Sequence, residues 1–477
     1  MVGNKFNPLS EEEIELIHSY SLKVLEEVGI KVKDCSAYEV FKKNKAITNG
    51  DLVKIPRSMV LDALESTPSK VVLYGRQQRH TLELKGREVH LGTGGAALNV
   101  IDLDSKEPRK ATLRDIMLLA KLVENLEYVD FYIRPVVAQD VPKEELDINK
   151  YYASMLGTTK HVMGSVYSIK SFHQVKKLAS IIAGSLESLK KRPFISFITC
   201  WMRSPLALDP QATEIMMEIV KERLPVVLSS APMAGSTAPI TLGGCLVQIH
   251  AEILSGLVLS QLVNPGTPVI YGYVPSVANP ISMDYLGGSA EFGLLNAGAV
   301  QLAAHFGLPN YSSAGLTDSK IPDAQAGIEK ALSILQVAMA GGNYIHHAAG
   351  MLESMLTVSY AQYVIDNDML GMVSRILKGI EINDNSLAFD VISKVGPGGN
   401  YISEKHTAKN LRKEYFFPKV MDRDLRKEWT AKGSQDLWQK ANNRVKAILS
   451  SDQLPKIPEG VDFQIRKTFN ILIKDIK

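Results

Sequence analysis

The middle of the chain alternates short, apolar, β-rich runs with longer stretches of helical pattern, and this alternation constrains the fold more than any other feature. The β-rich runs are Val89–Leu91, Val129–Val137, His161–Tyr167, Phe194–Cys200, Pro225–Leu228, Pro268–Tyr273, Asn310–Ser313 and Asn343–His347. Eight strands alternating with helices over about 250 residues are typical of a TIM (β/α)8 barrel. An open doubly wound α/β sheet shares this rhythm but seldom reaches eight evenly spaced units. We therefore predict an α/β barrel.

The flanking regions differ from the middle in texture. Ser10 and Glu13 form a capping-box pattern that opens an amphipathic helical region. After about residue 380 the chain becomes charged and aromatic. We therefore predict a helical N-terminal extension over residues 1–85, the barrel over residues 86–380, and a helical C-terminal extension over residues 381–477. The last is expected to pack on the barrel or on another subunit.

Composition excludes several classes of function. The 477 residues carry 54 Lys and Arg against 51 Asp and Glu, so no strong positive charge marks a nucleic-acid-binding protein. The three cysteines include no CxxC pair, which argues against a disulfide scaffold and a cysteine zinc site. Residues 1–13 lack the apolar core of a signal peptide. The apolar stretch Leu242–Val263 contains Gln248, His250 and Glu252, which favours a buried helix over a membrane span. We expect a cytoplasmic protein.

In a TIM barrel the active site lies at the C-terminal ends of the strands. Gly94 and Gly95 follow the first predicted strand, in the stretch Gly92–Ala97 that matches GxGxxA. A strand-like segment follows instead of a helix, which argues against dinucleotide binding. Two interpretations remain: a tight turn, or a nest of backbone N–H groups that could hold a carboxylate.

His346 and His347 end the last predicted strand. Successive side chains of a strand point to opposite faces, so only one of the two is expected to face the barrel interior. The alternative for each is a packed structural histidine. No HExxH or HxH pattern supports a zinc site, and no GxSxG pattern supports a Ser-His-Asp hydrolase. We therefore assign no metal and no catalytic residue.

Three aromatic residues, Trp201, Tyr273 and Tyr344, lie near predicted strand ends. Aromatic faces attract quaternary ammonium groups by cation–π interaction, although ordinary barrel packing explains such residues equally well. Lys320 lies in a predicted loop before a helix, where it is either a catalytic lysine or a solvated one.

Several stretches of this chain resemble the trimethylamine methyltransferase family. They are Leu91–Gly95, Asn99–Asp102, Ala231–Pro239, Asn264–Pro268, Asp318–Gln325 and Val395–Tyr401. The resemblance covers nearly the whole chain and implies a TIM barrel. It also implies transfer of a methyl group from a methylated amine to the Co(I) of a separate corrinoid protein.

One departure from the family narrows the expected substrate. The founding trimethylamine enzymes carry pyrrolysine in the barrel mouth, whereas this chain has only standard residues; Lys320 lies in the segment where the equivalent position is expected. Similar members without pyrrolysine use quaternary amines such as glycine betaine. A quaternary nitrogen already carries a positive charge and leaves as a neutral tertiary amine, so it needs no activating adduct.

The resemblance implies a role for each candidate residue. Trp201, Tyr273 and Tyr344 would surround the ammonium group, while Gly94 and Gly95, with His346 or His347, would hold the carboxylate. The chain itself would bind no cofactor, because the corrinoid belongs to the partner protein. We also expect a homo-oligomer. The alternatives are a methyltransferase for a tertiary amine, with Lys320 or a neighbour as the pyrrolysine position, and a non-catalytic betaine-binding barrel.

Overall fold

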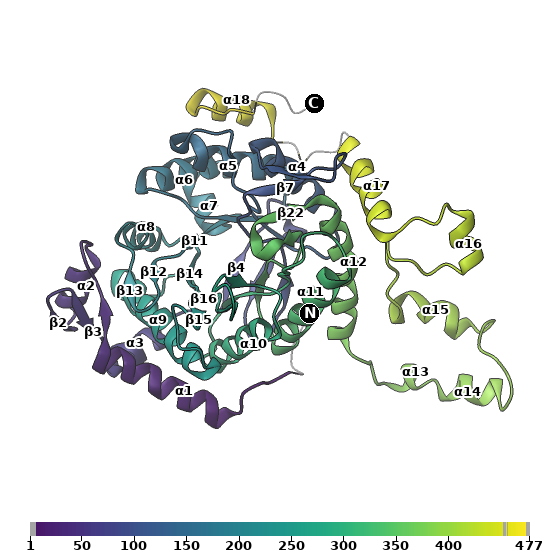
Figure 1. The fold of residues 1–477 in the computed structure, drawn as a ribbon, viewed down its shortest axis with the longest axis horizontal. Coiled ribbons are helices and arrows are strands. Elements are labelled where there is room, and N and C mark those ends of the chain that lie inside the picture. The colour runs from purple at the N-terminus through teal and green to yellow at the C-terminus, as the bar shows by residue number, and fades with distance from the viewer. Residues whose placement is uncertain (1–5, 452–454, 456, 474–477) are drawn as a thin grey trace.

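A computed structural model describes residues 6–451, 455 and 457–473, and eight parallel strands form a barrel at its centre (Figure 1). The strands are β6 (His90–Leu91), β9 (Phe131–Ile133), β10 (His161–Gly164), β11 (Ile195–Thr199), β14 (Val226–Ser230), β16 (Val269–Tyr273), β19 (Asn310–Ser313) and β20 (Tyr344–His346). A parallel bridge between Gly92 and Phe131 joins the edge strands β6 and β9. Each predicted β-rich run overlaps one barrel strand, so the predicted TIM barrel is confirmed.

Helices surround the barrel, as the alternating pattern requires. They are α4 (Leu113–Glu124), α5 (Lys143–Gly157), α6 (Ile169–Ala183) with α7 (Leu186–Lys191), α8 (Pro210–Lys221), α9 (Leu242–Val263), α10 (Ala290–His305), α11 (Ala324–Ala340) and α12 (Tyr360–Lys378). Among the described residues, only α9 is long and apolar enough to cross a membrane. Of its most apolar 18-residue stretch, 78% is buried inside the protein. Because α1, α3 and α10 cover it, α9 is a core helix of this fold.

The N-terminal end of the barrel is closed by a hairpin of β4 (Val71–Leu73) and β5 (Leu82–Leu84). Its apolar side chains form one buried cluster with interior residues such as Phe131 and Met163. The backbone N–H of Tyr74 donates to the carbonyl of Pro193, just before β11. A ligand cannot enter past this hairpin, so we look for the site at the C-terminal end, where the active site of this fold lies.

The N-terminal extension contains strands as well as the expected helices. It includes α1 (Glu11–Lys23), a π-helical turn (Val24–Val28), β1 (Ile30–Lys31), α2 (Ala37–Lys43), β2 (Ile47–Asn49), β3 (Leu52–Lys54), α3 (Arg57–Ser66), β4, a 3-10 turn (Gln78–His80) and β5. Ser10 caps α1 in the predicted capping box with Glu13. Residues 1–5 of the N-terminal stretch that lacks a signal-peptide pattern lie outside the described residues.

Small sheets built from the loops after the barrel strands surround the C-terminal mouth. One contains β15 (Met233–Ala234), β17 (Ser276–Ala278) and β18 (Tyr285–Leu286). Another contains β21 (Met351–Leu352), β22 (Thr357–Ser359), β7 (Asn99–Ile101) and β8 (Pro108–Lys110), with a 3-10 turn (Glu353–Met355) between β21 and β22. The strands β12 (Met202–Arg203) and β13 (Ala207–Leu208) join β1, β3 and β2.

The C-terminal extension divides into two parts. Residues 380–431, named here the arm, contain α13 (Asp384–Leu387), α14 (Phe389–Val395), α15 (Lys405–Glu414) and α16 (Arg426–Ala431). These helices project away from the barrel (Figure 1), whereas the backbone N–H groups of Lys419, Val420 and Met421 anchor the arm to Asp368 of α12. The helices α17 (Leu437–Ser450) and α18 (Glu459–Thr468) return to the body, where α17 packs on α12 and α4, and α18 packs on α6.

Candidate active site

A column of stacked aromatic rings runs through the barrel interior. The Phe131 and Tyr344 rings are parallel with centroids 3.5 Å apart, and Tyr311 stacks 4.1 Å from His346. The His346 and His347 centroids are 3.8 Å apart. Phe131, Tyr311 and Tyr344 belong to the interior apolar cluster, because they occupy inward positions of β9, β19 and β20. The alternation of strand side chains thus collects rings from three strands in one place.

Several polar atoms of this column are buried without a hydrogen-bond partner. Both ring nitrogens of His346 and the hydroxyl of Tyr344 are in this state. Buried polar groups in native proteins are almost always paired, and an unpaired one calls for an explanation such as a ligand or a water. His346 and Tyr344 therefore mark the part of the interior that a bound molecule would satisfy.

Unlike those of His346, the ring nitrogens of His347 have hydrogen-bond partners within the protein. Its Nδ1 lies 2.8 Å from the Ser313 hydroxyl, and its Nε2 lies 3.5 Å from the Gly95 carbonyl oxygen. Its φ of 64° is left-handed, so the extended alternation of β20 ends at His346. The expectation that adjacent histidines point to opposite faces does not describe this pair, because a left-handed residue no longer follows the strand.

Both histidines are uncharged at neutral pH. Burial lowers the pKa of His346 well below its usual value, and the neighbouring His347 lowers it further. Burial likewise lowers the pKa of His347 to about 3. A neutral imidazole carries one N–H donor and one acceptor nitrogen. His346 can therefore orient a ligand by hydrogen bonding without repelling a cation.

Gly94 and Gly95 lie against this histidine pair. A Cβ atom on Gly94 would lie 2.2 Å from Cδ2 of His347, and one on Gly95 would lie 2.0 Å from the carbonyl oxygen of Arg134. Only glycine fits this close approach. Within the described chain, neither glycine donates its N–H to an intramolecular acceptor. Both groups are thus available to a ligand, as the nest interpretation requires.

Trp201 and Tyr273 point away from the interior. Trp201 packs on α9, where a Cβ on Gly256 would lie 2.3 Å from its ring. Tyr273 packs beside Tyr271 on the outer face of β16, and its hydroxyl donates to Oδ1 of Asn310 over 3.2 Å. The structure therefore brings together Gly94, Gly95, Tyr344, His346 and His347, but neither Trp201 nor Tyr273.

Lys320 lies on the loop between β19 and α11. Its side chain is exposed, and its Nζ donates to the carbonyl oxygen of Asp318 over 2.7 Å. The following helix begins as predicted, with Asp323 as its N-cap. Lys320 thus has the contacts of a loop lysine.

The sequence-based assignment missed Cys200 and Arg134. Cys200 continues the inward positions of β11 after Ile198 and is exposed, although burial raises the pKa of its thiol. It is close enough to Tyr311 to influence the pKa of that hydroxyl. Arg134 follows β9 directly, and its Nε is buried without a partner. A charged residue immediately after an apolar strand was the signal available in the sequence.

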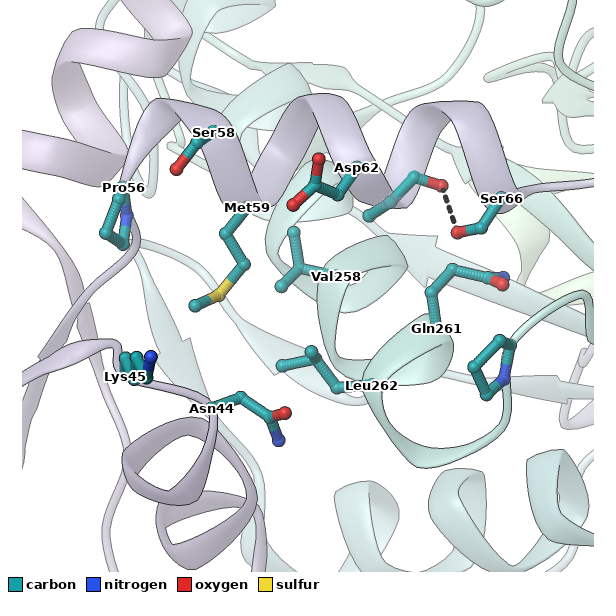
Figure 2. Close-up of a pocket in the computed structure, with 12 residues that line it drawn as sticks. Asn44, Lys45, Pro56, Ser58, Met59, Asp62, Ser66, Val258, Gln261 and Leu262 are labelled. Carbon is teal, nitrogen blue, oxygen red and sulfur yellow. Dashed lines mark hydrogen bonds between the residues drawn. The ribbon is translucent and has the colours of Figure 1, made fainter.

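A cavity of about 480 Å³ lies elsewhere, between α3 and the C-terminal part of α9 (Figure 2). Met59, Val258 and Leu262 line it, together with the charged residues Lys45 and Asp62. It adjoins the segment that leads into the N-terminal end of β16, opposite the barrel mouth. This position separates it from the ring column.

No metal site emerges from the described residues, because no three His, Cys, Asp or Glu side chains among them are grouped closely enough to hold an ion.

Comparison with known proteins gives a consistent result. The sequence model of the family "Trimethylamine methyltransferase (MTTB)" matches residues 2–470. The chain is 37% identical over 459 residues to a trimethylamine methyltransferase MttB of Desulfitobacterium hafniense (strain DSM 10664 / DCB-2), covering 96% of this chain and 92% of that protein. It is 32% identical over 464 residues to a glycine betaine methyltransferase of D. hafniense (strain Y51), covering 97% and 96% respectively.

A solved structure shares the fold. The crystal structure of a complex of MtmB with hydroxylamine superposes with a TM-score of 0.55, covering 95% of this chain and 90% of that one. Sequence identity is 13%, so this likeness concerns the fold alone.

Proposed function

Because the chain belongs to the trimethylamine methyltransferase family, we propose that it transfers a methyl group from a quaternary amine to the Co(I) of a separate corrinoid protein. Glycine betaine or a related betaine is the proposed donor. The observation that carries this proposal is the buried ring column, in which His346 and Tyr344 hold polar atoms without partners. Aromatic faces and neutral donors suit a ligand that is both cationic and polar.

The proposed reaction needs no proton transfer. The electron pair of Co(I) forms a bond to one N-methyl carbon, and the C–N bond breaks with its electron pair remaining on nitrogen. A neutral tertiary amine leaves, and the cobalt becomes methyl-Co(III). The neutral state of His346 and His347 agrees with this chemistry, because neither a general acid nor an extra positive charge is required beside the ammonium group.

The barrel would contribute orientation. Tyr311, Tyr344 and His346 would pack around the ammonium group so that one methyl points out of the mouth. The free N–H groups of Gly94 and Gly95 would donate to the other end of the substrate. Holding reactants in line contributes several kcal/mol to lowering a barrier, up to about 7–11 kcal/mol in ideal cases. Trp201 and Tyr273 have no part in this arrangement, because they pack outward.

The methyl acceptor would approach from outside the barrel. The N-terminal end is closed by the β4–β5 hairpin, so the corrinoid domain of the partner would dock over the C-terminal mouth. The chain itself would then bind no cofactor. We place this reaction in the cytoplasm, where the corrinoid partner would also be found.

We also propose that the arm joins copies of this chain into a homo-oligomer. Ile380, Phe389, Ile402 and Leu425 are each more than 70% exposed on it. Single exposed apolar residues on a surface are common, but several of them on one projecting segment favour an interaction site.

A direct assay tests the proposed activity. The purified chain is mixed with Co(I) cobalamin and, separately, with glycine betaine, carnitine, γ-butyrobetaine and trimethylamine, and methylcobalamin formation is followed by absorbance. Methylation from at least one quaternary amine is expected. Methylation from trimethylamine alone would contradict the proposal and favour the tertiary-amine alternative. Thermal stabilisation by a betaine without methylation would favour the binding protein.

A further inference from the structure

A group of charged side chains lies beside the mouth, where β9 and β10 end. Arg134 follows β9, Asp147 and Lys150 lie on α5, and Tyr167 lies in the loop after β10. Asp147 and Lys150 are almost fully buried. The group contains two cations and one carboxylate, so its balance is one positive charge.

Both oxygens of the Asp147 carboxylate already have partners within the protein. One of its oxygens pairs with Nζ of Lys150, and the other accepts from the backbone N–H of Tyr167 over 2.8 Å. Lys150 also lies over the Tyr167 ring, with Nζ 4.9 Å from the centroid. Asp147 therefore neutralises Lys150 and leaves Arg134 without a counter-ion.

Arg134 has spare donors. Its Nη1 donates to the Val136 carbonyl oxygen over 3.1 Å, while its Nε is buried and makes no hydrogen bond. No carboxylate among the described residues lies within ion-pair distance of its guanidinium. Burial lowers the pKa of Arg134, yet part of the side chain stays accessible to solvent.

Arg134 is also connected with the ring column. Its carbonyl oxygen lies against Gly95, and Arg134 directly follows β9, the strand that carries Phe131 of the column. Tyr151 is close enough to influence the pKa of the Tyr344 hydroxyl and that of the Arg134 guanidinium. The Arg134 backbone and the Gly95 turn therefore lie side by side, at the ends of β9 and β6.

We propose that Arg134 binds the carboxylate of a zwitterionic substrate, with the Gly94 and Gly95 N–H groups completing the site. This inference rests on the proposed function and assigns the residues that would bind the carboxylate of the proposed betaine. A guanidinium binds a carboxylate through two parallel N–H···O bonds, which are stronger than bonds between neutral groups. The neutral donors of the column lack the charge that such an anion requires.

The test measures binding without any corrinoid. Titration calorimetry compares glycine betaine and γ-butyrobetaine with choline, a quaternary amine that lacks a carboxylate. Arg134→Gln is expected to weaken the binding of at least one betaine by about 10-fold or more, since charged hydrogen bonds are the stronger class, and to leave choline binding unchanged. Arg134→Lys keeps the positive charge but cannot form two parallel hydrogen bonds to a carboxylate, so it is expected to weaken betaine binding less than Arg134→Gln does.

The matched control is Arg203→Gln, since Arg203 is already paired with Asp209. It should leave the affinity for every ligand unchanged. Circular dichroism and the melting temperature show whether Arg134→Gln is folded, and if it is not, Arg134→Lys alone carries the test. Equal loss of betaine and choline binding, no loss of either, or no betaine binding by the wild type would overturn the carboxylate site.

The failure of this inference can be told apart from failure of the proposed function. If Arg134→Gln selectively loses betaine binding while the wild type forms no methylcobalamin, the carboxylate site stands and the methyl transfer does not. If the wild type methylates cobalamin from a betaine and Arg134→Gln binds that betaine unchanged, the methyl transfer stands and the carboxylate site is wrong.

Discussion

The barrel interior holds buried polar atoms without hydrogen-bond partners, whereas the arm exposes apolar side chains to solvent. In the interior, His346 and Tyr344 enclose polar atoms that have no partners. On the arm, Phe389 and Ile402 expose 75% and 86% of their surface to solvent. Buried polar atoms without partners call for a small ligand or water, whereas exposed apolar side chains favour contact with a macromolecular surface. The contrast predicts that the proposed methyl transfer and the proposed assembly depend on different residues of this chain.

The largest effect is expected on assembly. Replacing both Phe389 and Ile402 by Asp should abolish burial of two large side chains, which contribute about 1.5–3 kcal/mol each when fully buried. The dissociation constant of the oligomer should therefore rise by a factor of about 100 or more, because about 1.4 kcal/mol corresponds to a factor of ten. Light scattering during size-exclusion chromatography measures the mass.

A charge change at an exposed polar position of the same arm, Lys409→Asp, is the control and should leave the mass unchanged. Because assembly and catalysis are expected to be separable, the double variant should keep its methyl-transfer rate per chain. A wild-type chain that is monomeric at every concentration would refute the assembly role of the arm.

The next effect is on the interior. His346→Phe preserves the size of the ring and its stacking on Tyr311 but removes both nitrogens. Methyl transfer should fall by about 100-fold, the loss that a small misplacement of reactants can cause. Stability should stay the same or rise, because the removed polar atoms have no partners to lose. Steady-state kinetics and thermal melting are measured on the same preparation.

In contrast to His346→Phe, His347→Phe is expected to lower stability. This ring bonds the Ser313 hydroxyl, so its replacement should lower the free energy of unfolding by about 1–3 kcal/mol by leaving a buried hydroxyl unpaired. Denaturant titration measures the loss. Equal effects of the two substitutions on both activity and stability would show that the histidines do not divide these roles.

The barrel could be predicted from sequence because its strands are buried on both faces. Such strands need continuous apolar runs such as Pro268–Tyr273, which stand out between helical stretches. The short strands of the N-terminal extension, such as β1, have no such run and depend on pairing with β3 and β13 for their existence. Local sequence carries little information about pairings of this kind.

The site was harder to predict because orientation depends on single residues. Cys200 and Trp201 are neighbours, and only the register of β11 decides that Cys200 lies on the inward side while Trp201 packs on α9. His347 leaves the strand alternation because its backbone is left-handed, and a histidine does not predict that conformation. Tyr344 and His346, which lie within the regular part of β20, could be placed from the pattern.

The smallest effect concerns acid stability and separates the two regions again. The pKa of buried His347 is about 3 in the folded chain, against about 6.5 for an unperturbed histidine. Between these values the unfolded chain binds a proton that the folded chain does not, so the free energy of unfolding rises with pH. The stabilisation is fully present above about pH 6.5 and declines as the pH falls toward 3, by at most about 1.4 kcal/mol per pH unit for one group.

His347→Phe should therefore show a shallower loss of stability than the wild type between pH 6.5 and 4.5, measured by denaturant titration at each pH. The control is His406→Gln, because His406 lies on the arm and its Nε2 contacts the Asn385 carbonyl oxygen rather than a carboxylate. If the wild type and His347→Phe lose stability in parallel, His347 is protonated alike in the folded and unfolded chains. The interior would then be open to water, and its contrast with the arm would rest on His346 and Tyr344 alone.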